Sequence, residues 1–138
     1  MSLDDLEREE FIKKLPVDQK KIQDSIRLAA RDISSAKTML NTDFDWAFSI
    51  AYNAMLQTLR AFMFSKGYRP AGGNQHLSVV RFSEVFLDDE TVAVFDRMRR
   101  KRHVSIYDTV GSISKKEAEY AINQAEHLHQ KIKTMLNQ

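Results

Sequence analysis

The fold is decided by residues 43–66, which read DFDWAFSIAYNAMLQTLRAFMFSK. Drawn as a helix, this stretch is apolar almost all the way round, and a helix of that kind is buried on several sides. We therefore expect it at the centre of the molecule. Its polar residues form one narrow stripe, which faces solvent or forms the wall of a polar groove or of a dimer contact: Ser49, Asn53, Gln57 and Arg60.

Amphipathic segments flank this central helix. Apolar residues recur at intervals of three and four along residues 18–40, 75–86 and 90–107, and Ser114 opens a last helix with a capping box. This pattern predicts an all-α fold, an antiparallel four- to five-helix up-and-down bundle. We expect it to span residues 17–138. Residues 1–16 are expected to form an N-terminal arm or a short helix that runs from about residue 4 to residue 14, before Pro16.

Composition narrows the classes of function. The chain has 138 residues, no cysteine and a formal net charge of +2, so disulfides and thiolate metal sites are excluded. His127 and His129 are two residues apart and point to different sides of a helix, so we expect no metal and no cofactor. No apolar run approaches the roughly 20 residues of a membrane span. Residues 1–10 lack the apolar core of a signal peptide, and we expect a cytoplasmic protein without membrane contact.

Positive charge is concentrated at one place. Five cationic side chains fall within six positions: Arg97, Arg99, Arg100, Lys101 and Arg102. Such a run is either a solvated helix face with salt bridges or a phosphate site, because arginine binds phosphate bidentately. We assign phosphate binding to Arg99, Arg100 and Lys101. Arg102 lies in the apolar stripe of its helix, so it is either buried against a partner or faces another subunit.

A histidine and a tyrosine follow this run. Arg99, His103 and Tyr107 are each four residues apart and lie in a line on one helix face. Arginines beside the His103 imidazole would oppose its protonation, which suits a general base. The alternative is an exposed or hydrogen-bonded histidine without a catalytic role.

Two blocks resemble the HEPN family (higher eukaryotes and prokaryotes nucleotide-binding domain). One is residues 51–68, which precede a loop and His76, and the other is residues 97–108. The resemblance implies a helical bundle that commonly dimerises. It also implies metal-independent ribonuclease chemistry, often in a toxin whose antitoxin is a small nucleotidyltransferase. In the family motif an Arg precedes a His by four to six residues, with a polar residue directly after the Arg. The Arg holds the scissile phosphate and the His moves the proton of the 2′-hydroxyl.

The motif fits this sequence in two registers. Arg97 and His103 have five residues between them, but Met98 then occupies the polar position. Arg102 and His103 fit the Arg-polar pair better, which places Tyr107 where the family has its catalytic His. A tyrosine with an ordinary pKa of about 10 is a poor proton shuttle at neutral pH. The candidate catalytic residues are therefore Arg97, Arg102, His103 and Tyr107.

Three hypotheses follow. The first is a homodimer that binds RNA or nucleotide phosphate, or a nucleotidyltransferase partner, through residues 97–108, as part of a toxin–antitoxin pair. The second is an active endoribonuclease that uses Arg97 or Arg102 with His103. The third is an interaction bundle without a role in nucleic-acid binding.

Overall fold

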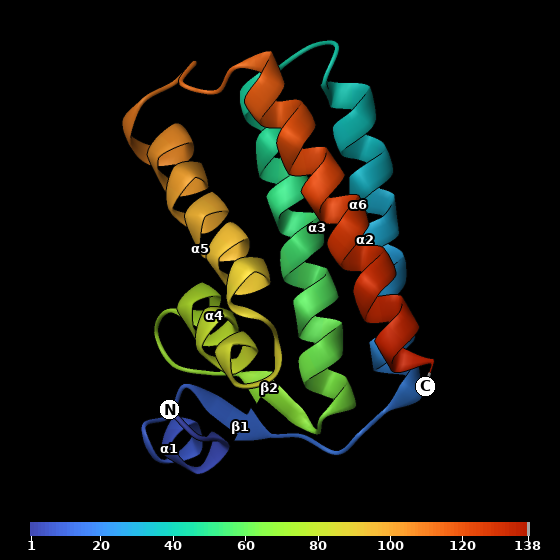
Figure 1. The fold of residues 1–138 in the computed structure, drawn as a ribbon, viewed down its shortest axis with the longest axis vertical. Helices are drawn as coiled ribbons and strands as arrows, with labels where there is room; N and C mark the ends of the chain where they lie inside the picture. The colour runs from blue at the N-terminus through green and yellow to red at the C-terminus, as the bar shows by residue number, and fades with distance from the viewer. Residues whose placement is uncertain (138) are drawn as a thin grey trace.

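The computed structural model describes residues 1–137, so Gln138, the last residue of the expected bundle, lies outside the described residues. Helix α3 (Phe44–Ser65) lies at the centre, with α2 (Gln19–Met39) and α6 (Lys115–Leu136) on one side and α5 (Asp89–His103) on the other (Figure 1). Helix α4 (Gln75–Phe86) lies across the lower end beside α5. The long helices alternate in direction, so the predicted all-α up-and-down bundle is confirmed.

The helices begin at short polar side chains that accept backbone N–H groups. Asp18, Asp43, Asn74, Asp88 and Ser114 are the N-caps of α2 to α6 in turn. Each cap satisfies a donor that the helix itself leaves without a partner. Because such caps are local in sequence, the long helices begin within a few residues of the predicted positions.

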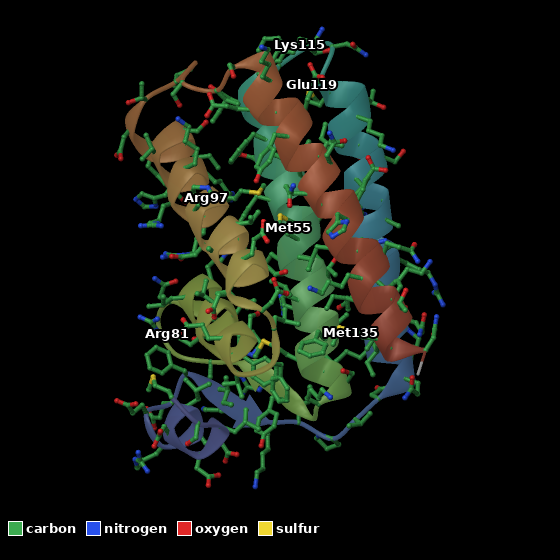
Figure 2. All side chains as sticks on the ribbon, in the orientation of Figure 1. Met55, Arg81, Arg97, Lys115, Glu119 and Met135 are labelled. Carbon is green, nitrogen blue, oxygen red and sulfur yellow. The ribbon has the colours of Figure 1, made fainter. Side chains whose placement is uncertain are left out.

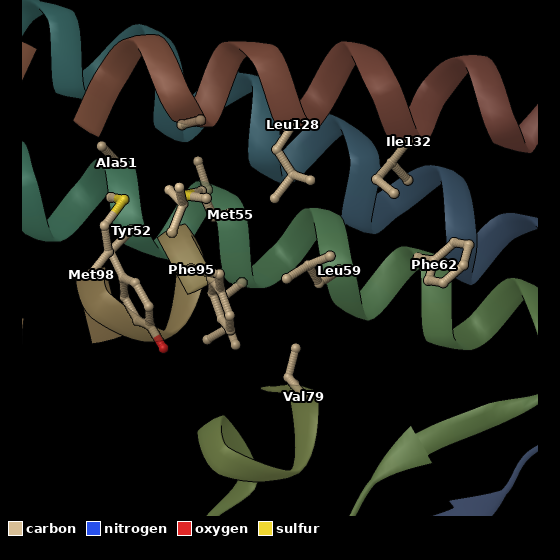
Figure 3. Close-up of a cluster of buried hydrophobic side chains, with 14 of the residues drawn as sticks. Ala51, Tyr52, Met55, Leu59, Phe62, Val79, Phe95, Met98, Leu128 and Ile132 are labelled. Carbon is tan, nitrogen blue, oxygen red and sulfur yellow. The ribbon is translucent and has the colours of Figure 1, made fainter. Parts of the chain in front are cut away.

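The core is built around α3. Tyr52, Met55 and Leu59 on this helix are at most 1% exposed. Figure 3 shows them facing side chains of the surrounding helices, among them Val79, Phe95, Met98, Leu128 and Ile132. Burial on nearly every side explains why the sequence of α3 is apolar almost all the way round.

The N-terminal segment differs from the predicted helix over residues 4–14. Helix α1 (Leu3–Arg8) ends early, Glu10 adopts a φ of 64°, and Ile12–Lys14 forms strand β1. Strand β1 pairs antiparallel with β2 (Tyr68–Pro70), and Ile12 lies opposite Pro70. The helix prediction was wrong after Arg8, because the partner that makes this segment extended lies more than fifty positions away in the chain.

Helix α5 also ends before the predicted Tyr107. It stops at His103, and Val104–Asp108 form a π-helical turn, η1. The Asp45 carboxylate, at the start of α3, then accepts the N–H groups of Gly111 at 2.6 Å and Ile113 at 3.2 Å. This anchor draws the loop after η1 back to α3, so the end of α5 and the start of α3 lie at the same end of the bundle.

Candidate functional site

The basic run does not form one surface, because its side chains lie on two sides of α5. Arg97, labelled on α5 in Figure 2, lines a cavity with residues of α6, and Lys101 pairs with Glu117 of α6 at 3.4 Å. Arg102 instead lies over the ring of Tyr52 on α3. The five cations thus belong to separate sites that the sequence alone could not distinguish.

Arg102 packs within its own chain. Its guanidinium carbon is 5.4 Å from the centre of the Tyr52 ring, a distance at which a cation is attracted to an aromatic face. The Arg102 Nε atom is buried and has no hydrogen-bond partner among residues 1–137. Arg102 is thus half-buried against Tyr52 of the same chain, and its contact with a second subunit stays a prediction.

Arg99 and Arg100 share a single carboxylate. The Asp96 side chain accepts from Arg99 Nε at 2.9 Å and lies 2.8 Å from Arg99 Nη2. The same carboxylate is 3.6 Å from Arg100, whose side chain is 67% exposed. Two guanidinium groups beside one carboxylate leave a positive charge in excess, so these ion pairs do not cancel the charge of this face.

A buried tyrosine and a histidine meet beside these arginines. The Tyr52 hydroxyl and His76 Nδ1 are 2.9 Å apart, and the Tyr52 ring stacks on Phe95 at 5.2 Å between centroids. Figure 3 shows Tyr52 beside Phe95 in the core. Burial raises the pKa of Tyr52 well above its usual range, so the hydroxyl stays protonated and can donate to Nδ1.

The pKa of His76 is lowered, chiefly by burial and then by the positive charges of Arg102, Arg99 and Arg60. The imidazole is therefore neutral near pH 7. Arg99 and Arg102 of α5, Tyr52 of α3 and the neutral His76 of α4 come together here, and we call these four residues the arginine–histidine cluster. Its excess of positive charge favours an anion.

The two registers of the motif are not assembled within one chain. His103 and Tyr107 are both exposed, their ring centroids are 4.8 Å apart, and Tyr107 is 68% exposed. Arg97 lies on the α6 side of α5, so its side chain and the His103 ring occupy different faces of the helix.

The neutral histidine beside arginines is His76, which the sequence analysis had not singled out as a site residue. Its partner Tyr52 is 24 positions away, and the two belong to different helices. The available signal was the single tyrosine of the central helix, followed by a histidine after the next loop. No rule of sequence spacing predicts that these two residues meet. The packing of α4 and α5 against α3 brings them together.

The part of the chain that the structure describes contains neither a group of metal ligands nor a membrane-spanning helix. Within residues 1–137, no group of three or more His, Asp or Glu side chains is arranged to hold a metal ion. His129 instead lies with Nε2 3.1 Å from the carbonyl oxygen of Ile26. None of the helices in this range is both long and apolar enough to span a membrane.

Comparison with known proteins supports the resemblance. The family model of the HEPN domain matches residues 22–135. The fold is similar to the crystal structure of TT1696 from Thermus thermophilus, with a TM-score of 0.68 and 17% sequence identity over 83% of this chain and 97% of that chain. No match was found among curated proteins.

Proposed function

This chain belongs to the HEPN domain family, and we propose that it binds the phosphates of RNA or of a nucleotide through α5, in the cytoplasm. The observation that carries this proposal is the arginine–histidine cluster. There Arg102 lies over the ring of Tyr52, whose hydroxyl is 2.9 Å from His76 Nδ1, and Arg99 pairs with Asp96 of the same helix. The cluster lies where α3, α4 and α5 meet, and α5 supplies both of its arginines.

Phosphate is the anion that suits this cluster best. A guanidinium group donates two parallel hydrogen bonds to phosphate oxygens, and the buried Nε atom of Arg102 has no acceptor among residues 1–137. A neutral His76 adds a ring nitrogen without adding another charge that repels the arginines. Arg100, largely exposed beside the cluster, extends the positive field into solvent and attracts a polyanion.

We further propose that the protein is a homodimer. Large apolar side chains are exposed at the end of the bundle where Asp45 anchors the loop, namely Phe44, Trp46, Ile106, Tyr107 and Val110. Trp46 is 55% exposed and Val110 is 91% exposed. A second copy would cover this end and bring two α5 helices together.

The other candidate for this surface is a small nucleotidyltransferase, as in a toxin–antitoxin pair, and a reading frame for such a protein beside the gene would support it.

RNA cleavage is the second candidate function. Exposed His103 and Tyr107 lie ring to ring at the end of α5, where a second subunit could supply an arginine. We expect weak or absent cleavage by the wild type, because Tyr107 occupies the catalytic position in the better register. The test is incubation with total RNA in EDTA. Tyr107→His should increase cleavage, whereas strong cleavage lost in His103→Ala but kept in Tyr107→Phe would establish the Arg97–His103 register.

Binding is tested with three α5 cations and a charge-matched control. Changing Arg99, Arg100 and Lys101 together to Ala should lower the affinity for a labelled single-stranded RNA by about tenfold or more, since each charge-assisted contact is worth roughly 1.5 kcal/mol or more. The control changes three exposed cations of α2 that also form ion pairs, Arg27, Arg31 and Lys37. Equal losses in the two triple variants would mean that net charge, and not α5, determines binding.

A further inference from the structure

A separate cavity lies between α5 and α6, on the side of α5 that carries Arg97 and Lys101. It has a volume of about 330 Å³ and is lined by Phe48, Arg97, Met98, Lys101, Lys116, Glu117 and Tyr120. Figure 2 shows Arg97 on α5 and Lys115 at the start of α6, the two helices that border it. None of its lining residues belongs to the arginine–histidine cluster.

The inner surface of this cavity is apolar. Phe48 and Met98 are each 3% exposed, so the cavity reaches down to side chains of the core. Tyr120 of α6 is 43% exposed and offers a ring at the side. Two aromatic rings and a thioether favour a flat aromatic group, because rings stack on rings and sulfur contacts ring edges.

Positive charge borders the same cavity. Arg97 and Lys116 have no carboxylate within ion-pair distance among residues 1–137, whereas Lys101 pairs with Glu117 at 3.4 Å. Three cations and one carboxylate leave a formal charge of +2 at the lining. A ligand that satisfies both the apolar floor and the charged border must be apolar at one end and anionic at the other.

We infer that this cavity binds a small aromatic acid. Its planar ring packs against Phe48, Met98 and Tyr120, and its phosphate or carboxylate is held by Arg97 and Lys116. The volume is near the lower end of the range of small-molecule sites, roughly 300–1,000 Å³, which suits one ring system and excludes a folded peptide or an RNA helix. The cavity does not overlap the arginine–histidine cluster, and of the cations changed in the RNA-binding test it shares Lys101 alone.

Because the cavity is lined by both cations and a carboxylate, one substitution should weaken anion binding and another should strengthen it. Lys116→Ala should weaken binding of phenyl phosphate about tenfold, as expected when one charge-assisted contact is lost. Glu117→Gln should strengthen binding several-fold, because it frees Lys101 while the amide oxygen still accepts the Ser114 N–H that caps α6. Lys115→Ala is the matched control, since Lys115 is the adjacent exposed lysine and does not line the cavity.

The experiment is calorimetric titration of the full chain with phenyl phosphate, benzoate, adenosine monophosphate, inorganic phosphate and benzyl alcohol. We expect the three probes that combine a ring with an anion to bind, and Tyr120→Ala to weaken them. A preference for adenosine monophosphate would identify a nucleotide, and a preference for the smaller probes a simple aromatic acid.

Three results would overturn the inference. They are no binding of any ring-bearing anion at millimolar concentration, inorganic phosphate binding as tightly as phenyl phosphate, and equal losses in Lys115→Ala and Lys116→Ala. Amide chemical shifts locate the ligand, and shifts centred on Tyr52 and His76 in place of Tyr120 would also contradict the proposed site.

Discussion

Arg102 shows how one side chain connects the basic helix to the core. Its guanidinium lies over Tyr52, so we expect Arg102→Ala to lower the free energy of unfolding by about 1 kcal/mol through the lost cation–π contact and stem packing. Arg100→Ala, which removes a side chain that is 67% exposed, should change it by less than about 0.5 kcal/mol. Urea denaturation measures both values. Equal effects of the two variants would mean that Arg102 is not packed as described.

His76 gives the protein a specific pH dependence. Its pKa is lowered in the folded state, whereas the unfolded chain has the ordinary value of 6.5. Between these two values the unfolded state binds more protons, so the free energy of unfolding falls as the pH drops below about 6.5. Above that pH, His76 does not change the dependence of the free energy of unfolding on pH. Denaturation of the wild type and of His76→Gln at pH 7.5 and 5.5 should therefore show the smaller decrease in the variant, and an equal decrease would contradict this account.

Individual site residues were predictable only in part. The cations of residues 97–102 can be located from the sequence, but the side of α5 that each one faces depends on α3 and α6. Arg97 and Arg102 are therefore separated although both fit the family motif. His76 and Tyr52 meet across two helices, and no local pattern predicts their hydrogen bond.

Whole elements were easier to predict when their signals were local. The bounds of α2, α3, α4 and α6 follow from their caps and from the periodicity of their apolar residues. Strands β1 and β2 have only three residues each, and their pairing is distant in the chain. The π-helical turn after His103 is likewise followed by a loop whose anchor, Asp45, lies 66 positions from Gly111 in the chain.

The N-terminal segment offers a prediction at the scale of an element. Leu6 of α1 is fully buried, so Leu6→Ala should lower the free energy of unfolding by about 2 kcal/mol or more. Val17→Ala is the control, because Val17 is 55% exposed and its truncation should change stability by less than about 0.5 kcal/mol. Chemical denaturation tests both. A Leu6→Ala protein as stable as the control would mean that α1 does not pack on the bundle in solution.

For the whole molecule we predict a homodimer at tens of micromolar by light scattering. Trp46→Glu should give a monomer, because it places a charge among the apolar side chains at the end of the bundle. Val17→Glu is the matched control, since Val17 and Trp46 are each 55% exposed. A monomeric wild type would remove the proposal of a dimer, and a dimer that persists in Trp46→Glu would place the interface elsewhere.

The central claim, that the arginine–histidine cluster binds phosphate, is tested most directly by the salt dependence of RNA affinity. Fluorescence anisotropy with a labelled single-stranded RNA gives log Kd against log salt for the wild type, for Arg99→Ala with Arg102→Ala, and for Arg27→Ala with Arg31→Ala on α2. Each phosphate contact to a single strand contributes about 0.7 to the slope. We predict that the α5 double variant loses about 1.4 from the slope and that the α2 variant keeps the slope of the wild type. An unchanged slope in the α5 variant, or binding by the wild type that does not depend on salt, would contradict the claim.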